Sequence, residues 1–389
     1  MAGRAPTKRW LKIAEGILGR PTAPLLEESP ADWIRGFVAA RPGLSLDQDR
    51  WGNLIVKYPG ARKPKSPPLV LVAHLDHPGF VVTELKGDRA HLEFRGGVRL
   101  PHAKRGTSLD FYRHGSTRAI GRGTLTSASA KGGRRPGMLA SANARITRGR
   151  AEAGGFTMWA FPAYAVRRGR IESRCLDDLL GVAAALATLD EVNRRRPRGA
   201  HVWGYFTRAE EIGLFGALAG IRARAIPRNA RVLSLETSRA LPHAPQGGGV
   251  IVRVGDARSL FEPRLMGVLH RFSQELAASD PDFRFQRRLM DGGSCEATAF
   301  CAAGYRCGGL AVPLGNYHNM KGLDGGPVGI GAESVAVPDY VSEVKLLLRL
   351  AEESSRLPRL EQETQGWVND LTARAQAALG AAPLRTQGR

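Results

Sequence analysis

Cysteine is scarce in this sequence, and the cysteines that occur follow no ligand spacing. There are four in 389 residues, and no two of them form a Cys-x-x-Cys pair. This argues against a disulfide-stabilised secreted fold and against a closed thiolate metal site. We therefore expect a reducing compartment.

Long apolar runs are absent as well. No run approaches the roughly 20 residues that a membrane-spanning helix needs. The basic segment 1–20 lacks the uninterrupted apolar core of a signal peptide. We expect a soluble, cytoplasmic protein without a membrane partner.

Acidic residues are too few to balance the basic ones. Asp and Glu number 36 against 57 Lys and Arg, so the formal charge is +21. Runs such as Arg194-Arg195-Arg196-Pro197-Arg198 can bind nucleic acid or select acidic peptides. No nucleic-acid motif or interleaved aromatic residue accompanies them, so we do not expect a nucleic-acid partner. A basic nucleic-acid-binding protein with a non-catalytic metal site is kept as the alternative of another class.

Segment 201–211 combines a strand pattern with paired carboxylates. The apolar run 201–206 is typical of a buried strand, and Glu210 and Glu211 follow it closely. Two ionised carboxylates at a strand end repel each other and lose hydration, so a metal ion or a shared proton usually accounts for the pair. The pair therefore predicts further ligands elsewhere in the chain.

Other ligand-type residues also stand beside apolar runs: His74 and Asp76 after residues 68–73, Asp177 before the helical pattern 179–186, Glu236 after 231–235, and His318 after 310–314. In an open α/β sheet, ligands bind where the carboxyl ends of parallel strands meet. His74 and Asp76 are two apart and face the same side of a regular strand. The Asp76 carboxylate can therefore orient the His74 ring from the side of the ring that faces away from a metal ion.

The order of these segments resembles the co-catalytic zinc aminopeptidases of the M42 family, which are more distantly related to the M20 and M28 families. The similarity runs from about Asp49 to Leu350 and covers most of the chain. It implies a metallopeptidase, a hydrolase that removes N-terminal residues from short peptides. It also implies a homo-oligomer, although no feature of the sequence fixes the stoichiometry.

The resemblance implies a role for each candidate residue: His74 and Glu236 for one metal ion, Glu211 and His318 for the other, and Asp177 as the bridge between them. Glu210 would be the general base, and Asp76 would assist by orienting His74. These imidazole and carboxylate ligands suit zinc, with cobalt or manganese as alternatives. We expect two divalent ions per chain, which polarise the scissile carbonyl and lower the pKa of a water molecule.

Length and turn composition predict two domains. From about residue 83 to 170, short alternating strands replace the helical pattern and are separated by turns such as Arg95-Gly96-Gly97. We predict an α/β fold with a three-layer αβα mixed-sheet catalytic domain, residues 1–82 and 171–389. The inserted small β-barrel-like domain, residues 83–170, would serve as a lid or a dimerisation surface. Helical spacing further predicts helices over 31–38, 260–276, 340–350 and 367–379.

Several neighbours of the ligands depart from the M42 pattern: His77 stands where a Glu is common, Leu179 for an Arg, Glu236 for an Asp, and Asn319 for a Ser. The relatives' Gly-Thr-Asp segment also differs, at Gly293 to Glu296. These departures leave open an M20-like N-acyl amino acid deacylase or dipeptidase. The insertion lies before Asp177, whereas the M20 pattern places its extra domain after the third ligand, and this favours the M42 assignment.

Overall fold

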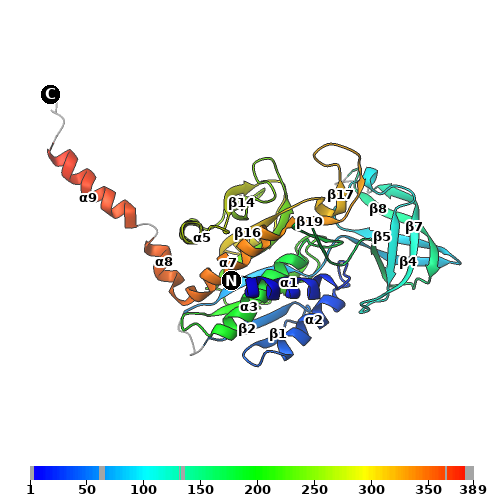
Figure 1. The fold of residues 1–389 in the computed structure, drawn as a ribbon, viewed down its shortest axis with the longest axis horizontal. Helices are drawn as coiled ribbons and strands as arrows, with labels where there is room; N and C mark the ends of the chain where they lie inside the picture. The colour runs from blue at the N-terminus through cyan, green and yellow to red at the C-terminus, as the bar shows by residue number, and fades with distance from the viewer. Residues whose placement is uncertain (1–3, 61–65, 131, 133–135, 364–365, 382–389) are drawn as a thin grey trace.

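The computed structural model describes residues 4–60, 66–130, 132, 136–363 and 366–381. Figure 1 shows a sheet covered by helices and, at one end of the molecule, a β-barrel. The expected mixed α/β fold with a barrel-like insertion is therefore confirmed.

An eight-stranded mixed sheet forms the larger part of the structure, in the order β1-β2-β12-β3-β13-β16-β14-β15. Its strands have these bounds: β1 (Ser45–Gln48), β2 (Leu54–Tyr58), β3 (Leu69–His74), β12 (Val202–Thr207), β13 (Arg231–Arg239), β14 (Val250–Asp256), β15 (Phe285–Met290) and β16 (Arg306–Leu314). The four adjacent strands β12, β3, β13 and β16 run parallel to one another. Their carboxyl ends consequently lie at one edge of the sheet.

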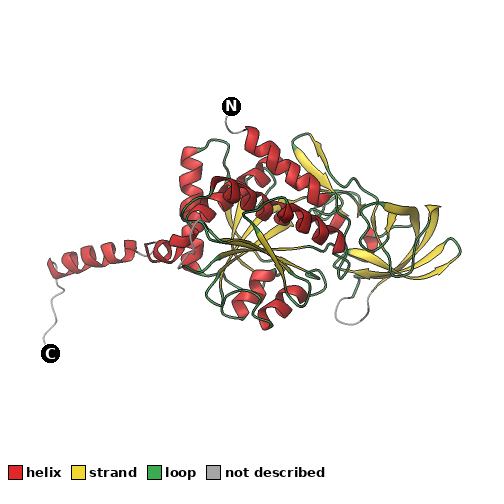
Figure 2. Ribbon diagram, turned by 90° about the horizontal axis from the view of Figure 1, so that it is seen from below, coloured by secondary structure: helices red, strands yellow, loops and turns green. Residues whose placement is uncertain are grey.

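The parallel strands are buried because helices cover both faces of the sheet (Figure 2). Every residue of β3 is buried, as a continuous apolar run predicts for a strand covered on both faces. On β13, Thr237 bonds to the Asp178 carboxylate, just before α3, while Ser234 bonds to Glu296 of α6. Side chains three apart on a strand point to opposite faces, so α3 and α6 lie on opposite sides of the sheet.

The helices of this part have these bounds: α1 (Arg4–Leu18), α2 (Glu28–Ala39), α3 (Leu179–Arg195), α4 (Phe215–Arg222), α5 (Pro263–Ser279), α6 (Glu296–Ala302), α7 (Val337–Glu352) and α8 (Leu357–Glu363). α1 packs on α3, and α3 packs on α7, whereas α4 packs with α6. This gives the helix-sheet-helix layering of the larger part.

A closed antiparallel barrel follows β3 directly, in the strand order β4-β5-β8-β7-β6-β9. Its elements are β4 (Gly79–Lys86), β5 (Arg89–Arg95), the 3₁₀ turn η1 (Leu100–His102), β6 (Ser108–Tyr112), β7 (Ala119–Ala130), β8 (Leu139–Gly149) and β9 (Phe156–Trp159). On β5, Ala90, Leu92 and Phe94 point into the barrel core while their neighbours are more exposed. This period of two predicts one face inside and one outside.

The barrel is joined to the larger part by short strands and turns: β10 (Ala165–Arg167), β11 (Arg170–Ser173), the 3₁₀ turn η2 (Tyr317–Asn319), β17 (Met320–Lys321), β18 (Gly329–Ile330) and β19 (Glu333–Ala336). β10, β11 and β19 form one small sheet, and β17 pairs with β18. The barrel strands run from Gly79 to Trp159. They begin before the expected start at residue 83 and end before the expected end at residue 170. The division into domains at those boundaries stays a prediction.

The last described helix, α9 (Gly366–Ala381), extends away from the rest of the molecule (Figure 1). All of its described residues are at least partly exposed. Among the described residues, no helix combines the length and the apolar character needed to cross a membrane.

Candidate metal centre

The parallel strands bring the seven candidate residues to one edge of the sheet. His74 is the last residue of β3, and Glu210 and Glu211 follow β12. Glu236 lies within β13, which continues three residues further to Arg239, and His318 lies in η2 after β16. Asp177 directly precedes the residue that caps α3. The edge expected from open α/β sheets is thus where these side chains meet.

Asp177 lies between the two histidines. Its Oδ1 atom is 3.3 Å from Nε2 of His74, and its Oδ2 atom is 3.5 Å from Nε2 of His318. Nε2 of His318 is also 3.1 Å from Oε1 of Glu211. One carboxylate with an imidazole at each oxygen is the arrangement needed to bridge two cations.

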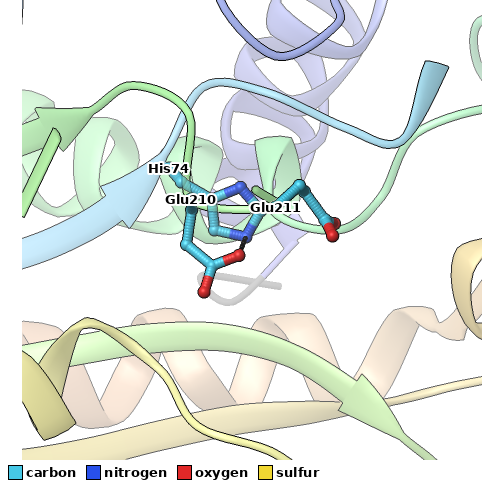
Figure 3. A group of neighbouring side chains, drawn as sticks. All are labelled: His74, Glu210 and Glu211. Atoms are coloured by element: carbon cyan, nitrogen blue, oxygen red, sulfur yellow. Dashed lines mark ion pairs between the residues drawn. The ribbon is translucent and has the colours of Figure 1, made fainter. Parts of the chain in front are cut away.

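Three overlapping groups could each hold an ion: His74 with Asp177 and Glu236, Asp177 with Glu211 and His318, and His74 with Glu210 and Glu211. Within each group the ligand atoms all lie within 4.8 Å of one another. The first two groups are the ligand sets that the resemblance implies. Figure 3 draws the third, in which Nε2 of His74 and Oε2 of Glu210 are 3.9 Å apart.

The orientation of both imidazole rings is fixed by backbone carbonyls. Nδ1 of His74 is 3.1 Å from the carbonyl oxygen of Asp76, and Nδ1 of His318 is 2.8 Å from that of Gly97. A carbonyl can only accept a hydrogen bond, so each Nδ1 carries a proton and each Nε2 faces the carboxylates. A neutral ring in this tautomer presents a lone pair to a metal ion.

Unsatisfied carboxylate oxygens also fit a metal. Oδ1 of Asp177, Oε1 of Glu211 and Oε1 of Glu236 are buried, and none has a hydrogen-bond partner among the described residues. Buried acceptors without donors are costly unless a cation satisfies them. The donor set of nitrogen and oxygen atoms, with no thiolate, suits two divalent ions of the zinc type.

Asp76 contacts both halves of the site. Its Oδ1 accepts a hydrogen bond from the backbone N–H of Glu210 at 2.9 Å, and its Oδ2 accepts one from that of Glu211 at 3.0 Å. Oδ1 is also 3.6 Å from Nδ1 of His74. The Asp76 carboxylate therefore fixes the turn that carries the glutamate pair, which strand spacing does not reveal. The closer contact to the His74 ring is made by the backbone carbonyl of Asp76, and the carboxylate lies within ion-pair range only.

Glu210 is the most accessible carboxylate of the centre. Its side chain is 15% exposed, against 5% for Glu211 and 5% for Asp177. Burial raises the pKa of Glu210 well above its usual value, His74 opposes this rise, and the charge of Glu211 adds to it. In the absence of metal ions, this environment favours a carboxyl group that holds a proton.

The same environment predicts an unusual pH dependence for the metal-free protein. Burial alone would lower the pKa of His74 and His318, but Asp177 and the carboxylates beside each ring raise both pKa values well above normal. Stability from these protonated rings is complete below the unfolded pKa of about 6.5 and is lost as the pH rises through the folded values. We expect the Tm of the chelator-treated protein to fall as the pH is raised from about 6 to about 8.

Thermal unfolding with and without zinc tests this expectation. Zinc needs unprotonated imidazoles, so its stabilising effect should grow over the same pH range. A Tm of the metal-free protein that rises between these two pH values would contradict the charged cluster described here.

Further residues behind the centre were not assigned from the sequence. Oε2 of Glu333 accepts hydrogen bonds from the backbone N–H groups of Leu176 and Asp177, at 2.6 and 3.1 Å. His77 links the carbonyl of Asp177 to the side chain of Asn319, at 2.6 and 3.0 Å. His77 and Asn319 both differ from the residues that are common at these positions in the M42 family. That difference was the sign in the sequence that they take part in the centre.

Comparisons with known proteins find the same fold in peptidases. The family model described as M42 glutamyl aminopeptidase matches residues 141–324. The aminopeptidase APDkam598 from Desulfurococcus kamchatkensis is 17% identical, covers 92% of this chain and 98% of its own, and has a TM-score of 0.72. The TET1 peptidase of Pyrococcus horikoshii, described as assembling into a tetrahedron or a large octahedral shell, is 18% identical, covers 88% and 99%, and has a TM-score of 0.67. No curated protein matches the chain.

Proposed function

We propose that this chain is a metal-dependent aminopeptidase of the M42 family that removes N-terminal residues from short peptides, because the M42 glutamyl aminopeptidase model matches residues 141–324. The observation that carries this proposal is the position of Asp177, whose two oxygens each face a different histidine. A second carboxylate accompanies each histidine in the ligand groups, Glu236 on one side and Glu211 on the other. This is a two-cation centre built from one bridge and two flanking sets.

We assign His74 and Glu236 to one ion, Glu211 and His318 to the other, and Asp177 to both. Zinc is the ion we expect, with cobalt and manganese as alternatives. When bound, two such ions polarise the scissile carbonyl, lower the pKa of a water molecule and hold the free amine of the substrate.

The side chains of the protein complete the reaction. Glu210 is more exposed than the ligands, so its carboxylate can reach water and substrate. It accepts a proton from the attacking water and donates it to the leaving amine. Asp76 supports this transfer by holding the backbone of Glu210 through a 2.9 Å hydrogen bond.

We also propose a homo-oligomer. The similar Pyrococcus horikoshii protein is described as assembling into large symmetric shells. A soluble, cytoplasmic protein remains our prediction.

The function is tested with purified protein, by measuring its metal content and then its activity after chelation and refilling with zinc, cobalt or manganese. Substrates are glutamyl and leucyl anilides with a free amine, the same anilides with an acetylated amine as matched controls, and N-acyl amino acids. We expect about two ions per chain and metal-restored cleavage of the free-amine anilides alone. Cleavage confined to N-acyl substrates would identify a deacylase, and a protein without bound metal would contradict the proposal.

A further inference from the structure

The barrel contributes a backbone group to the metal centre. Residues 96–99 form the loop of the barrel that connects β5 to η1. The carbonyl oxygen of Gly97 in this loop lies 2.8 Å from Nδ1 of His318. No other described hydrogen bond is made by that nitrogen. The ring of a candidate ligand on the larger part is therefore oriented by a loop of the inserted barrel.

This contact determines which nitrogen faces the ions. With its proton on Nδ1, His318 directs Nε2 to Oε1 of Glu211 at 3.1 Å and to Oδ2 of Asp177 at 3.5 Å. One face of the His318 ring packs against the ring of Tyr317, with ring centroids 3.8 Å apart and planes inclined by 23°. The loop carbonyl and the stacked ring together leave the imidazole a single orientation.

The backbone around His318 needs such support. Asn316, His318 and Asn319 all have positive φ angles, of 55°, 53° and 61°, which non-glycine residues adopt at a cost. The next residue, Met320, is buried in the barrel core, and its sulfur lies 3.4 Å from the backbone nitrogen of Arg99. The short hairpin that begins at Met320 lies beside the barrel (Figure 1). The segment is thus held in its strained conformation by the barrel.

Glycine at position 97 allows the close approach. A Cβ atom there would lie 3.4 Å from Nδ1 of His318, at the limit where the ring must give by a few tenths of an ångström, and 3.5 Å from Cε1, an ordinary contact. The φ angle of Gly97 lies outside the left-handed region, so alanine strains no backbone there. At Gly96, by contrast, φ is +124° and a Cβ atom would lie 2.7 Å from Pro78. Alanine at 97 therefore changes the contact with His318 and little else.

We propose that Gly97 of the barrel is a positioning residue for the second metal site, so that the inserted barrel is a structural part of the metal centre. This inference rests on the proposed two-metal function. The barrel loop acts through His318 and needs no contact with the substrate. Outer hydrogen-bond partners of metal ligands typically change metal affinity by about 10–100-fold when they are altered.

The test compares Gly97→Ala with Gly132→Ala, a barrel variant whose Cβ atom would meet no atom within 4 Å. Zinc binding to metal-free protein is measured by competition with a chromophoric chelator, together with the Tm of the metal-free forms. We expect Gly97→Ala to keep one site at wild-type affinity and to weaken the other by about 10–100-fold. Gly132→Ala should bind as wild type, and the two variants should have similar Tm values.

Other outcomes overturn the inference. Two sites of wild-type affinity in Gly97→Ala would show that the carbonyl does not position the ligand. Equal weakening of both sites would overturn it as well, because a residue that positions His318 alone should leave the first site at wild-type affinity. Failure of the proposed two-metal function can be distinguished from failure of this inference, because the wild-type protein itself would then bind no zinc. In that case the ¹⁵N shifts of the His318 ring decide, and a proton on Nε2 of the neutral ring would refute the contact with Gly97.

Discussion

Glutamine in place of Glu210 is expected to lower kcat by about 10²–10⁴-fold, the usual contribution of a general acid–base group. The amide cannot take the proton of the attacking water. The ligands His74, Asp177 and Glu211 are unchanged, so the variant should keep two metal ions per chain. The measurement is kcat on a free-amine aminoacyl anilide, with the metal content of the same sample.

Glu84→Gln is the matched control for this variant, because it removes a carboxylate of the same kind from an exposed position on β4. The control should keep wild-type kcat. Full activity in Glu210→Gln would assign the proton transfer to another group. Loss of activity together with loss of metal would make Glu210 a ligand, as its place in the group with His74 and Glu211 allows.

Asparagine in place of Asp177 should remove the bridge between the two proposed metal sites. The amide carries no charge and offers one oxygen where the carboxylate offers two, so it cannot bridge the sites at His74 and His318. We expect metal content to fall below two ions per chain. Losing the several kcal/mol that a metal centre contributes should lower kcat/KM by about 10³-fold or more.

Asp370→Asn is the control for the Asp177 variant, since Asp370 is exposed and lies on α9, the helix that extends away from the rest of the molecule. It should retain two ions and wild-type kcat/KM. Two tightly bound ions in Asp177→Asn would show that the histidines and glutamates suffice, and the bridging role would then be wrong.

The strands that carry the centre could be predicted because each is an apolar run followed by a ligand-type residue. The runs 68–73, 201–206, 231–235 and 310–314 fall within or overlap β3, β12, β13 and β16. Helical spacing placed the bodies of the helices correctly but not their ends. For example, α2 begins at Glu28, ahead of the expected start at 31, because Ser29 and Pro30 are accommodated in its first turn.

Other features had no signal in residue types. A backbone carbonyl such as that of Gly97 is chemically the same at every position, so only tertiary structure reveals that it holds His318. Strand β13 continues to Arg239 because its pairing with β16 extends beyond the apolar run. The pairing of β11 with β19 joins residues far apart in the chain, and local periodicity does not encode such a partner.

The hydrogen bonds of Asp76 to the backbone of Glu210 and Glu211 require no metal ion. The turn that carries Glu210 and Glu211 is therefore ordered when the chain folds, and its loss of conformational entropy does not oppose the metal binding that we propose. A zinc finger, by contrast, folds around its ion and unfolds without it. On the proposed assignment, ions can therefore bind and leave without refolding this turn, and occupancy can follow the free metal concentration in the surroundings.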